Sequence, residues 1–236
     1  MAVYNQKARI GLIYIIIFLT LLLILLVGYL FLLAPESSPK LTAVLGGLLT
    51  GFIVGLCQLF LSWYEYRSIE KFKKMKVLDI RSDRDDRSFY QNLIHNAKTH
   101  IDIMGVTATR FLEHFADIDS YREDSKTLLT VMSNGVTVRI LLPRENFLET
   151  QKQKDDAKHS LTKIASIKQN YSSKFNVKYF EHVSMHSIFI VDDECILGPV
   201  FPNISSKDTP AIHLENSSPY ASKYIRYFED EWDKAQ

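Results

Sequence analysis

The first quarter of the chain is dominated by two long apolar stretches with a short polar connector between them. They run over Ile10–Leu33 and Leu41–Trp63, and neither contains a charged side chain. As helices that rise about 1.5 Å per residue, each would reach about 35 Å, which exceeds the roughly 30 Å of a bilayer's hydrocarbon core. Because a helix satisfies its own backbone hydrogen bonds in lipid, the pattern predicts a membrane-spanning helical hairpin over residues 1–66.

A cleaved secretory signal and a buried core helix are the competing interpretations of the first stretch. Signal cores span about 7 to 15 apolar residues, which is much shorter than Ile10–Leu33. A helix that packs on the core of a soluble protein usually keeps a polar stripe that faces water, and neither stretch has such a stripe. The spanning hairpin is therefore the better interpretation.

Positive charge flanks the hairpin on the side of its two ends. Lys7 and Arg9 precede the first stretch, a basic run follows the second, and the connector carries one Lys and one Glu. Because Lys and Arg stay on the cytoplasmic side, we expect both termini in the cytoplasm of a bacterium. Residues 67–87 are predicted to form a basic juxtamembrane helix as far as Ile80, close to anionic lipid headgroups, and then a solvated linker over Arg81–Arg87.

Three glycines, Gly47, Gly51 and Gly55, lie at four-residue spacing in the second stretch. This spacing leaves one helix face without side chains, so that another helix can approach closely. The approaching helix belongs either to a second copy of the chain, which would make a homo-oligomer, or to the first stretch of the same chain. Gln58 is the one strongly polar residue deep in either stretch, and a transporter normally needs buried charge, so a transporter is not predicted.

The rest of the chain alternates between helical and strand patterns. The alternation predicts an α/β domain over residues 88–236, with a mostly parallel or mixed sheet covered by helices. The predicted helices are Phe89–Lys98, Arg110–Phe115, Tyr121–Asn134, Asp155–Tyr171 and Tyr220–Lys234, and the predicted strands are Ile101–Val106, Val136–Leu142, Val177–Phe180, Ser187–Val191 and Ile212–Leu214.

Charge is distributed unevenly between the two parts of the chain. Residues 1–76 hold eight Lys and Arg against three Asp and Glu, a net +5, whereas the remainder holds 20 against 24, a net −4. A mildly acidic domain lacks the basic surface of a nucleic-acid-binding protein, so no direct nucleic-acid binding is expected. The two cysteines, Cys57 and Cys195, are not expected to meet, which fits a reducing cytoplasmic compartment.

A polar pattern near the end of the chain carries the candidate chemistry. His186 is followed by Asp193 after seven positions and by Asn203 after ten more. This spacing resembles one half-site of the phospholipase D superfamily, in which His-x-Lys is followed by Asp after four residues and by Gly-Ser-x-Asn after six more. Glu215 stands where that family often has an acid. The resemblance covers residues 85–235 and implies a phospholipase-D-like half-domain with these four half-site residues.

Two departures from the family pattern weaken the implied catalysis. In that family one His attacks phosphorus, a second His protonates the leaving group, and Lys and Asn hold the phosphate oxygens. Here the Lys position holds Ile188, the Gly-Ser positions hold Val200 and Phe201, and Gly198 comes two residues early. Loss of one such donor costs about two to three orders of magnitude in rate. The chain thus resembles an inactive or much weakened relative, and a complete site would need a second chain.

No metal and no cofactor is expected. His182 and His186 would lie about 13 Å apart on an extended chain at some 3.3 Å per residue, too far to share one ion. Arg110, Arg139 and Arg144 are placed at or near strand ends, where open α/β sheets bind ligands. They are either ordinary surface charges or part of a remnant pocket that still binds a phosphate-containing ligand.

Three functions follow from these expectations. The first is a toxin-like effector of the bacterial inner membrane, a homo-oligomer that acts through its hairpin under control of the cytoplasmic domain. Its architecture is similar to two-span effectors of antiphage systems such as retrons, which implies an inhibitory protein or ribonucleoprotein partner. The second is a homodimeric, membrane-anchored phosphodiesterase or phospholipase with His186 as nucleophile. The third is a non-catalytic membrane-tethered sensor or scaffold.

Overall fold

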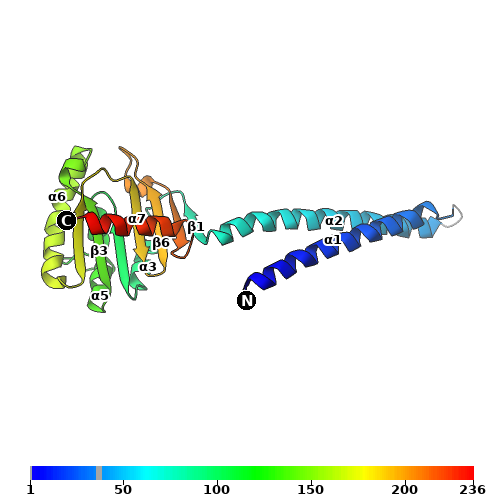
Figure 1. The fold of residues 1–236 in the computed structure, drawn as a ribbon, viewed down its shortest axis with the longest axis horizontal. Coiled ribbons are helices and arrows are strands. Elements are labelled where there is room, and N and C mark those ends of the chain that lie inside the picture. Colours follow the sequence, from blue (N-terminus) through cyan, green and yellow to red (C-terminus); the bar gives the residue numbers. More distant parts are fainter. Residues whose placement is uncertain (1, 36–38) are drawn as a thin grey trace. The chain divides into compact units, whose positions relative to one another are not determined.

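The computed structural model describes residues 2–35 and 39–236, which divide into two compact units, Met1–Lys71 and Phe72–Gln236. The first unit consists of long helices, and the second contains a seven-stranded sheet with helices on both faces (Figure 1). Part of the predicted connector, residues 36–38, lies outside the described residues.

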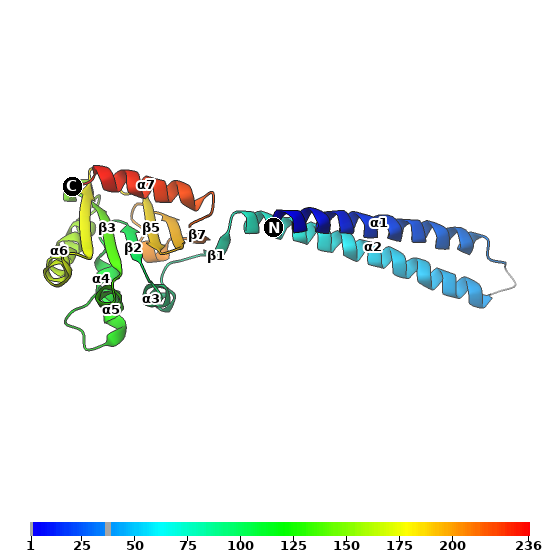
Figure 2. The same ribbon diagram turned by 60° about the horizontal axis from the view of Figure 1, so that its bottom comes forward.

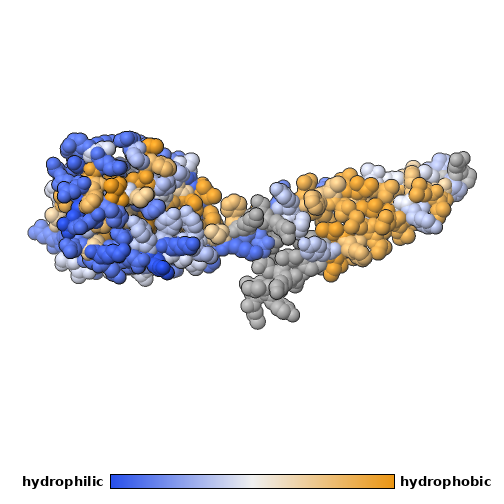
Figure 3. Space-filling view, turned by 45° about the horizontal axis from the view of Figure 1, so that its top comes forward, coloured by the Kyte–Doolittle hydropathy of each residue, from blue (hydrophilic) through white to orange (hydrophobic). Residues whose placement is uncertain are grey.

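The first unit is a pair of antiparallel helices, α1 (Ala2–Leu32) and α2 (Pro39–Lys74). Within them, Tyr14–Leu32 and Pro39–Glu65 are long and apolar enough to span a membrane. Almost none of the side chains in these two segments is buried, so the segments are not core helices of a soluble domain. Figure 3 shows the apolar surface that they present. The prediction of two long apolar helices is confirmed.

The two helices meet along a seam of partly buried residues that recur every three or four positions. Leu49 and Phe52 lie on the α2 side of this seam, and the buried Val27 lies on the α1 side. Such spacing is typical of helices that pack at a small crossing angle. Gly46 belongs to the seam, because a Cβ added there would lie 3.5 Å from the ring of Phe31.

The predicted juxtamembrane helix is correct as far as Lys74 and wrong beyond it. Lys76 has a φ of 53°, in the left-handed region, and Val77–Arg81 form strand β1. Strand β1 pairs antiparallel with β7 (Ala211–Glu215). The helix prediction failed here because the hydrogen-bonding partner of β1 lies far along the chain and leaves no local signal.

The second unit is built on one mixed sheet with the strand order β1-β7-β6-β5-β2-β3-β4. The remaining strands are β2 (His100–Met104), β3 (Thr137–Pro143), β4 (Phe175–Phe180), β5 (His186–Val191) and β6 (Glu194–Pro199). Strands β2, β3 and β4 are parallel, whereas all neighbours from β1 to β2 are antiparallel. The predicted fold class, an α/β domain with a mixed sheet covered by helices, is confirmed.

Helices cover both faces of this sheet (Figure 2). One face carries α3 (Arg87–His95), α4 (Thr109–Phe115), α5 (Thr127–Ser133) and α6 (Gln151–Tyr171), and the other carries α7 (Ala221–Lys234). Successive residues of a strand point alternately to these two faces. Ile103 and Phe189 belong to the core beneath α3–α6, whereas Met104 and Ile188 belong to the core beneath α7. The central strands are apolar on both sides because both faces are buried.

Local signals set the starts of several helices. The Thr150 hydroxyl accepts a hydrogen bond from the Gln153 amide, and the Gln153 side chain accepts one from the Thr150 amide, which is a capping box at the start of α6. The predicted helix Tyr121–Asn134 is shorter in the structure, because Glu123–Lys126 form a 3-10 turn before α5.

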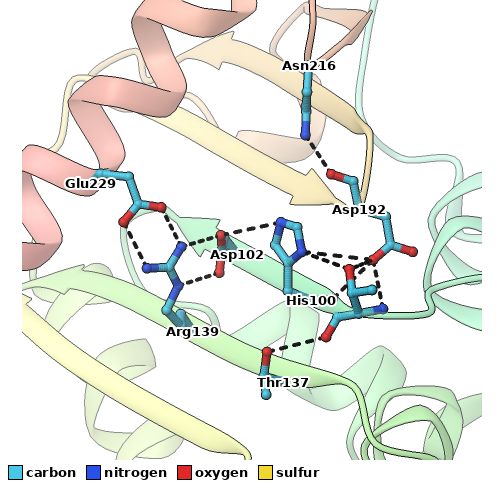
Figure 4. A network of polar contacts seen from close by, with 8 residues as sticks. His100, Asp102, Thr137, Arg139, Asp192, Asn216 and Glu229 are labelled. Carbon is cyan, nitrogen blue, oxygen red and sulfur yellow. Dashed lines mark hydrogen bonds and ion pairs between the residues drawn. The ribbon is translucent and has the colours of Figure 1, made fainter.

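A buried carboxylate and an arginine fasten α7 to the sheet (Figure 4). Asp102 of β2 is 2% exposed and accepts two hydrogen bonds from Arg139 of β3, at 2.7 and 2.6 Å. Arg139 also donates two to Glu229 of α7, at 2.9 and 2.6 Å. The hydrogen bonds to Asp102 and Glu229 raise the pKa of Arg139, and the contact with Arg139 lowers the pKa of Glu229. Bidentate pairs are directional as well as strong, so they fix the position of α7.

Replacement of Arg139 by alanine is expected to destabilise the protein by about 3–5 kcal/mol, because the buried Asp102 loses its two guanidinium hydrogen bonds and keeps, among the described residues, only the 3.9 Å contact with His100. The matched control is Arg144→Ala, just after the same strand, where the side chain is 43% exposed and pairs with Glu181. The control should change the free energy of unfolding by less than about 0.5 kcal/mol. Urea unfolding of the full chain in detergent measures both values, and equal losses would contradict the role given to Arg139.

Candidate functional site

The structure distributes the four half-site residues between the two ends of the sheet. His186 begins β5 and Asn203 lies in the loop after β6, at one end. Asp193 lies in the tight turn between β5 and β6, and Glu215 ends β7, at the other end. Because a strand rises about 3.3 Å per residue, β5 separates the two ends by about 20 Å. The four residues therefore do not form one cluster within this chain.

His186 packs against α7. Its ring makes edge-to-face contacts with Tyr224 and Tyr227, with centroid distances of 5.3 and 5.7 Å. Ile188, which stands at the lysine position of the resemblance, belongs to the core on the same face and is fully buried. At the lysine position, the buried Ile188 therefore supplies no positive charge. Phosphoryl transfer depends on such a charge to stabilise the transferring group.

The carboxylate that organises the far end of β5 is Asp192, one residue before the predicted Asp193 (Figure 4). Its side chain accepts hydrogen bonds from the backbone N–H groups of Lys98, Thr99 and His100 and from the Thr99 hydroxyl, at 2.6–3.0 Å. Burial opposes the charged form, but the hydrogen bonds from the Thr99 hydroxyl and the three amides outweigh it and lower the pKa of Asp192 to about 2. Asp192 thereby ties the β5–β6 turn to the start of β2.

Replacement of Asp192 by asparagine is expected to lower the free energy of unfolding by about 1–2 kcal/mol at pH 7, because an amide presents its own donor to several backbone N–H groups. The folded-state pKa lies below the unfolded value of roughly 3.9, so the stabilisation by Asp192 is present above about pH 5 and is lost as the pH falls through 4 toward 2. Urea unfolding at a series of pH values should therefore show the two proteins converging in acid.

The matched control for this experiment is Asp193→Asn, which alters a neighbouring carboxylate in the same turn. It should shift the free energy of unfolding by less than about 0.5 kcal/mol at any pH. A constant difference between wild type and Asp192→Asn from pH 7 to pH 2 would rule out the carboxylate as the anchor.

A cavity of about 160 Å³ opens at the end of the sheet where β2 ends and β5 begins. The strands line it with apolar side chains, among them Ile103, Phe189 and Ile196. Polar side chains also line it, among them Asp85 and the five that we call the arginine cavity residues: Arg84, Arg87, Tyr90, Arg110 and His114. The cavity lies at the carboxyl end of β2, which is where open α/β sheets bind ligands. The half-site residues do not line it.

Arg84 is the most buried charge of this cavity. It is 6% exposed and donates hydrogen bonds to the carbonyl oxygen of Pro199, at 3.1 Å, and to the hydroxyl of Thr209. Among residues 2–35 and 39–236, its guanidinium has no carboxylate partner, and its Nε has no hydrogen-bond partner. Burial lowers the pKa of Arg84, Tyr90 opposes this effect, and Arg110 adds to it.

Gly198 makes room for the Arg84 side chain. A Cβ at this position would lie 2.5 Å from the carbonyl oxygen of Pro210 and 3.3 Å from the guanidinium carbon of Arg84. The first distance is shorter than two such atoms can tolerate, so a side chain here would displace the backbone that surrounds Arg84. The early glycine noted in the sequence is therefore part of the wall behind the cavity.

Two further arginines approach the cavity from α3 and α4. Arg87 donates to the Ser125 hydroxyl at 3.1 Å and pairs with Asp124 at 3.2 Å. Arg110 is 36% exposed, and the ion pair that it makes with the exposed Asp85 is long, at 3.5 Å. Asp85 also lines the cavity, so three arginines face one carboxylate in its lining and the cavity keeps a net positive charge.

Burial and the nearby arginines shift the pKa values of two groups beside the cavity. Burial lowers the pKa of His114, and the charges of Arg87 and Arg110 lower it further. Burial raises the pKa of Tyr90, which outweighs the opposite effect of Arg84. Near neutral pH, Tyr90 is therefore a neutral hydroxyl that can donate a hydrogen bond into the cavity.

Sequence reasoning found one of the arginines in this cavity and missed the other two. Arg110 was singled out, whereas Arg84 and Arg87 fell in the predicted solvated linker. That prediction is wrong for Arg84, whose burial comes from Pro199 and Thr209, both remote in sequence. The three-residue spacing of Arg84 and Arg87 was the one local signal, and it is common on exposed surfaces.

Comparison with protein-family models and with the sequences of curated proteins finds no match. Solved structures with a similar fold include TrmBL2, an archaeal chromatin protein, at 12% identity and a TM-score of 0.46, with 82% of this chain and 70% of that chain covered. The phospholipase D family member Nuc from Salmonella typhimurium matches at 16% identity and a TM-score of 0.43, with 67% and 96% covered. NucT from Helicobacter pylori matches at 14% identity and 0.41, with 64% and 91% covered. These values record a partial likeness of fold.

Proposed function

We propose that this protein is a membrane effector that acts through its apolar hairpin and is regulated by its α/β domain without catalysis. The hairpin would insert into the bacterial inner membrane with both termini in the cytoplasm, because the Lys and Arg residues flank its open end. Its two helices expose their apolar side chains along their length, which is what lipid-facing helices require. A toxin-like role in antiphage defence, held in check by an inhibitory protein or ribonucleoprotein, is the form of this proposal that the architecture favours.

The observation that carries the proposal is the free glycine face of α2. A Cβ added to Gly47, Gly51 or Gly55 would meet no described atom within 4 Å, whereas one added to Gly46 would meet Phe31. The contact with α1 therefore uses a neighbouring face, and it leaves Gly47 and Gly51 exposed and Gly55 half-buried. On a lipid-exposed helix, a face without side chains favours close approach by another helix. Self-association of hairpins through this face would perturb the membrane.

The α/β domain is assigned a regulatory role because its half-site lacks what phosphoryl transfer needs. Ile188 is fully buried in the place of a lysine, and His186 contacts Tyr224 and Tyr227. A homodimeric phosphodiesterase or phospholipase would have to supply the missing cation from the second chain. The third alternative is a tethered sensor or scaffold without action of its own. In it the α/β domain is again regulatory, but the hairpin serves only as an anchor.

Replacement of Gly51 by isoleucine is expected to abolish growth inhibition on induced expression, because the branched side chain blocks the close approach of a second helix. Membrane depolarisation, followed with a potential-sensitive dye, should be lost together with the growth effect. Resistance to alkaline carbonate extraction should persist, since the helix remains apolar. Cys57→Ile is the matched control, because Cys57 is also exposed on α2 but lies off the glycine face. Undiminished inhibition by Gly51→Ile would sink the proposal, as would an equal loss in Cys57→Ile.

Replacement of His186 by alanine separates regulation from catalysis. We expect growth inhibition to be unchanged, because the residue contributes ring packing rather than a nucleophile. The purified full chain is likewise expected to leave phosphodiesters such as phosphatidylcholine and bis(4-nitrophenyl) phosphate intact. Circular dichroism checks that the variant is folded. Loss of inhibition in a folded variant, together with phosphodiester hydrolysis by the wild type, would favour the enzyme instead.

A further inference from the structure

We propose that the arginine cavity binds a small phosphate monoester, at a place separate from the half-site residues of the sequence resemblance. The inference gives a ligand class to the regulatory role proposed above and rests on that role for its biological meaning. The binding itself can be measured independently of any effect on the membrane.

The first support is the unbalanced charge of Arg84. An arginine stays protonated in proteins, so it cannot escape the cost of burial by losing its proton as a lysine can. Elsewhere in this domain, a buried charge has a partner of opposite sign, as Asp102 has in Arg139. Arg84 has two neutral acceptors and an Nε without a partner among the described residues. An anion in the cavity would supply the missing counter-charge.

The second support is the convergence of donors from separate elements. Arg84 comes from the segment after β1, Arg87 and Tyr90 come from α3, and Arg110 comes from α4. Guanidinium groups match the oxygens of a phosphate with paired hydrogen bonds, and several of them around one cavity distinguish a dianion from a monoanion. Arg110 is held by one long ion pair to an exposed Asp85, so it is free to turn toward a ligand.

The third support is the size and lining of the cavity. Its volume of about 160 Å³ is close to the roughly 150 Å³ of a cavity that holds benzene, and well below the roughly 300–1,000 Å³ of sites for drug-sized ligands. A phosphate with a short substituent fits this space, whereas a dinucleotide does not. Ile103 and Phe189 would contact the substituent. The ester could be a soluble metabolite or the headgroup of phosphatidic acid, which carry the same monoester group.

The test is a binding titration of the full chain in detergent micelles. Inorganic phosphate is the first probe, glycerol 3-phosphate represents a soluble ester, and nanodiscs with and without phosphatidic acid represent the lipid source. Sodium chloride at matched ionic strength accounts for general screening. We expect saturable binding of phosphate and tighter binding of one of the two esters, measured by calorimetry for the soluble probes and by interferometry for the nanodiscs.

Two variants and a control connect the binding to the cavity. Arg110→Ala should weaken binding about tenfold or more and should fold normally, because Arg110 is partly exposed and pairs with a surface carboxylate. Arg84→Gln removes the buried charge, and a variant that circular dichroism shows to be folded should also bind the probes more weakly than wild type. Arg144→Ala is the matched control, because Arg144 is also a partly exposed arginine with one acidic partner and lies outside the cavity.

Each outcome decides the question. Binding that is weakened by Arg110→Ala and kept by Arg144→Ala supports the site, and the tighter of the two esters identifies the source. Failure of wild type to bind any of the probes overturns the inference, and so does binding that Arg110→Ala leaves unchanged or that Arg144→Ala weakens equally. These results leave the hairpin proposal untouched, because that proposal is decided by Gly51→Ile in growing cells.

Discussion

The stability of the α/β domain depends on how its buried charged groups are compensated. A buried ion is costly unless a group of opposite sign or several hydrogen bonds compensate it. Asp102 satisfies this requirement through Arg139, which also reaches Glu229 and so joins β2, β3 and α7 in one contact. Asp192 satisfies it with four donors at the start of β2. Arg84 is the exception, and the exception falls in a cavity.

The two faces of the sheet differ in their polar groups. On the α7 face, His186 packs on tyrosines and Ile188 is fully buried. The α3–α6 face holds the arginine cavity, at the same end of the sheet. The convergent cations on the α3–α6 face support the proposal that this domain binds a phosphate ligand.

In the membrane location that we propose for the hairpin, lipid takes the place of water as the solvent. Lipid offers no gain from burying one apolar side chain against another, so helix contacts there depend on close packing. The α1–α2 seam uses Gly46 for this purpose, whereas a Cβ at Gly47, Gly51 or Gly55 would meet no described atom within 4 Å. The same sequence can therefore form a hairpin and still present a surface for another hairpin, which supports the proposed assembly.

The sequence by itself determined the features that arise from local periodicity. Uncharged apolar runs make the two long helices, and alternating patterns make an α/β domain with a mixed sheet. The spacing of His186, Asp193 and Asn203 is also visible there, as is the predicted strand Ser187–Val191 between the first two, but the pairing of β5, β6 and β7 decides which end of the sheet Asn203 and Glu215 share with them. Only the tertiary structure decided that Val77–Arg81 become a strand, because their partner β7 lies far along the chain. It also decided that Arg84, placed in a charged run typical of exposed linkers, is buried beside Pro199 and Thr209, because burial is a property of long-range contacts that local composition does not encode.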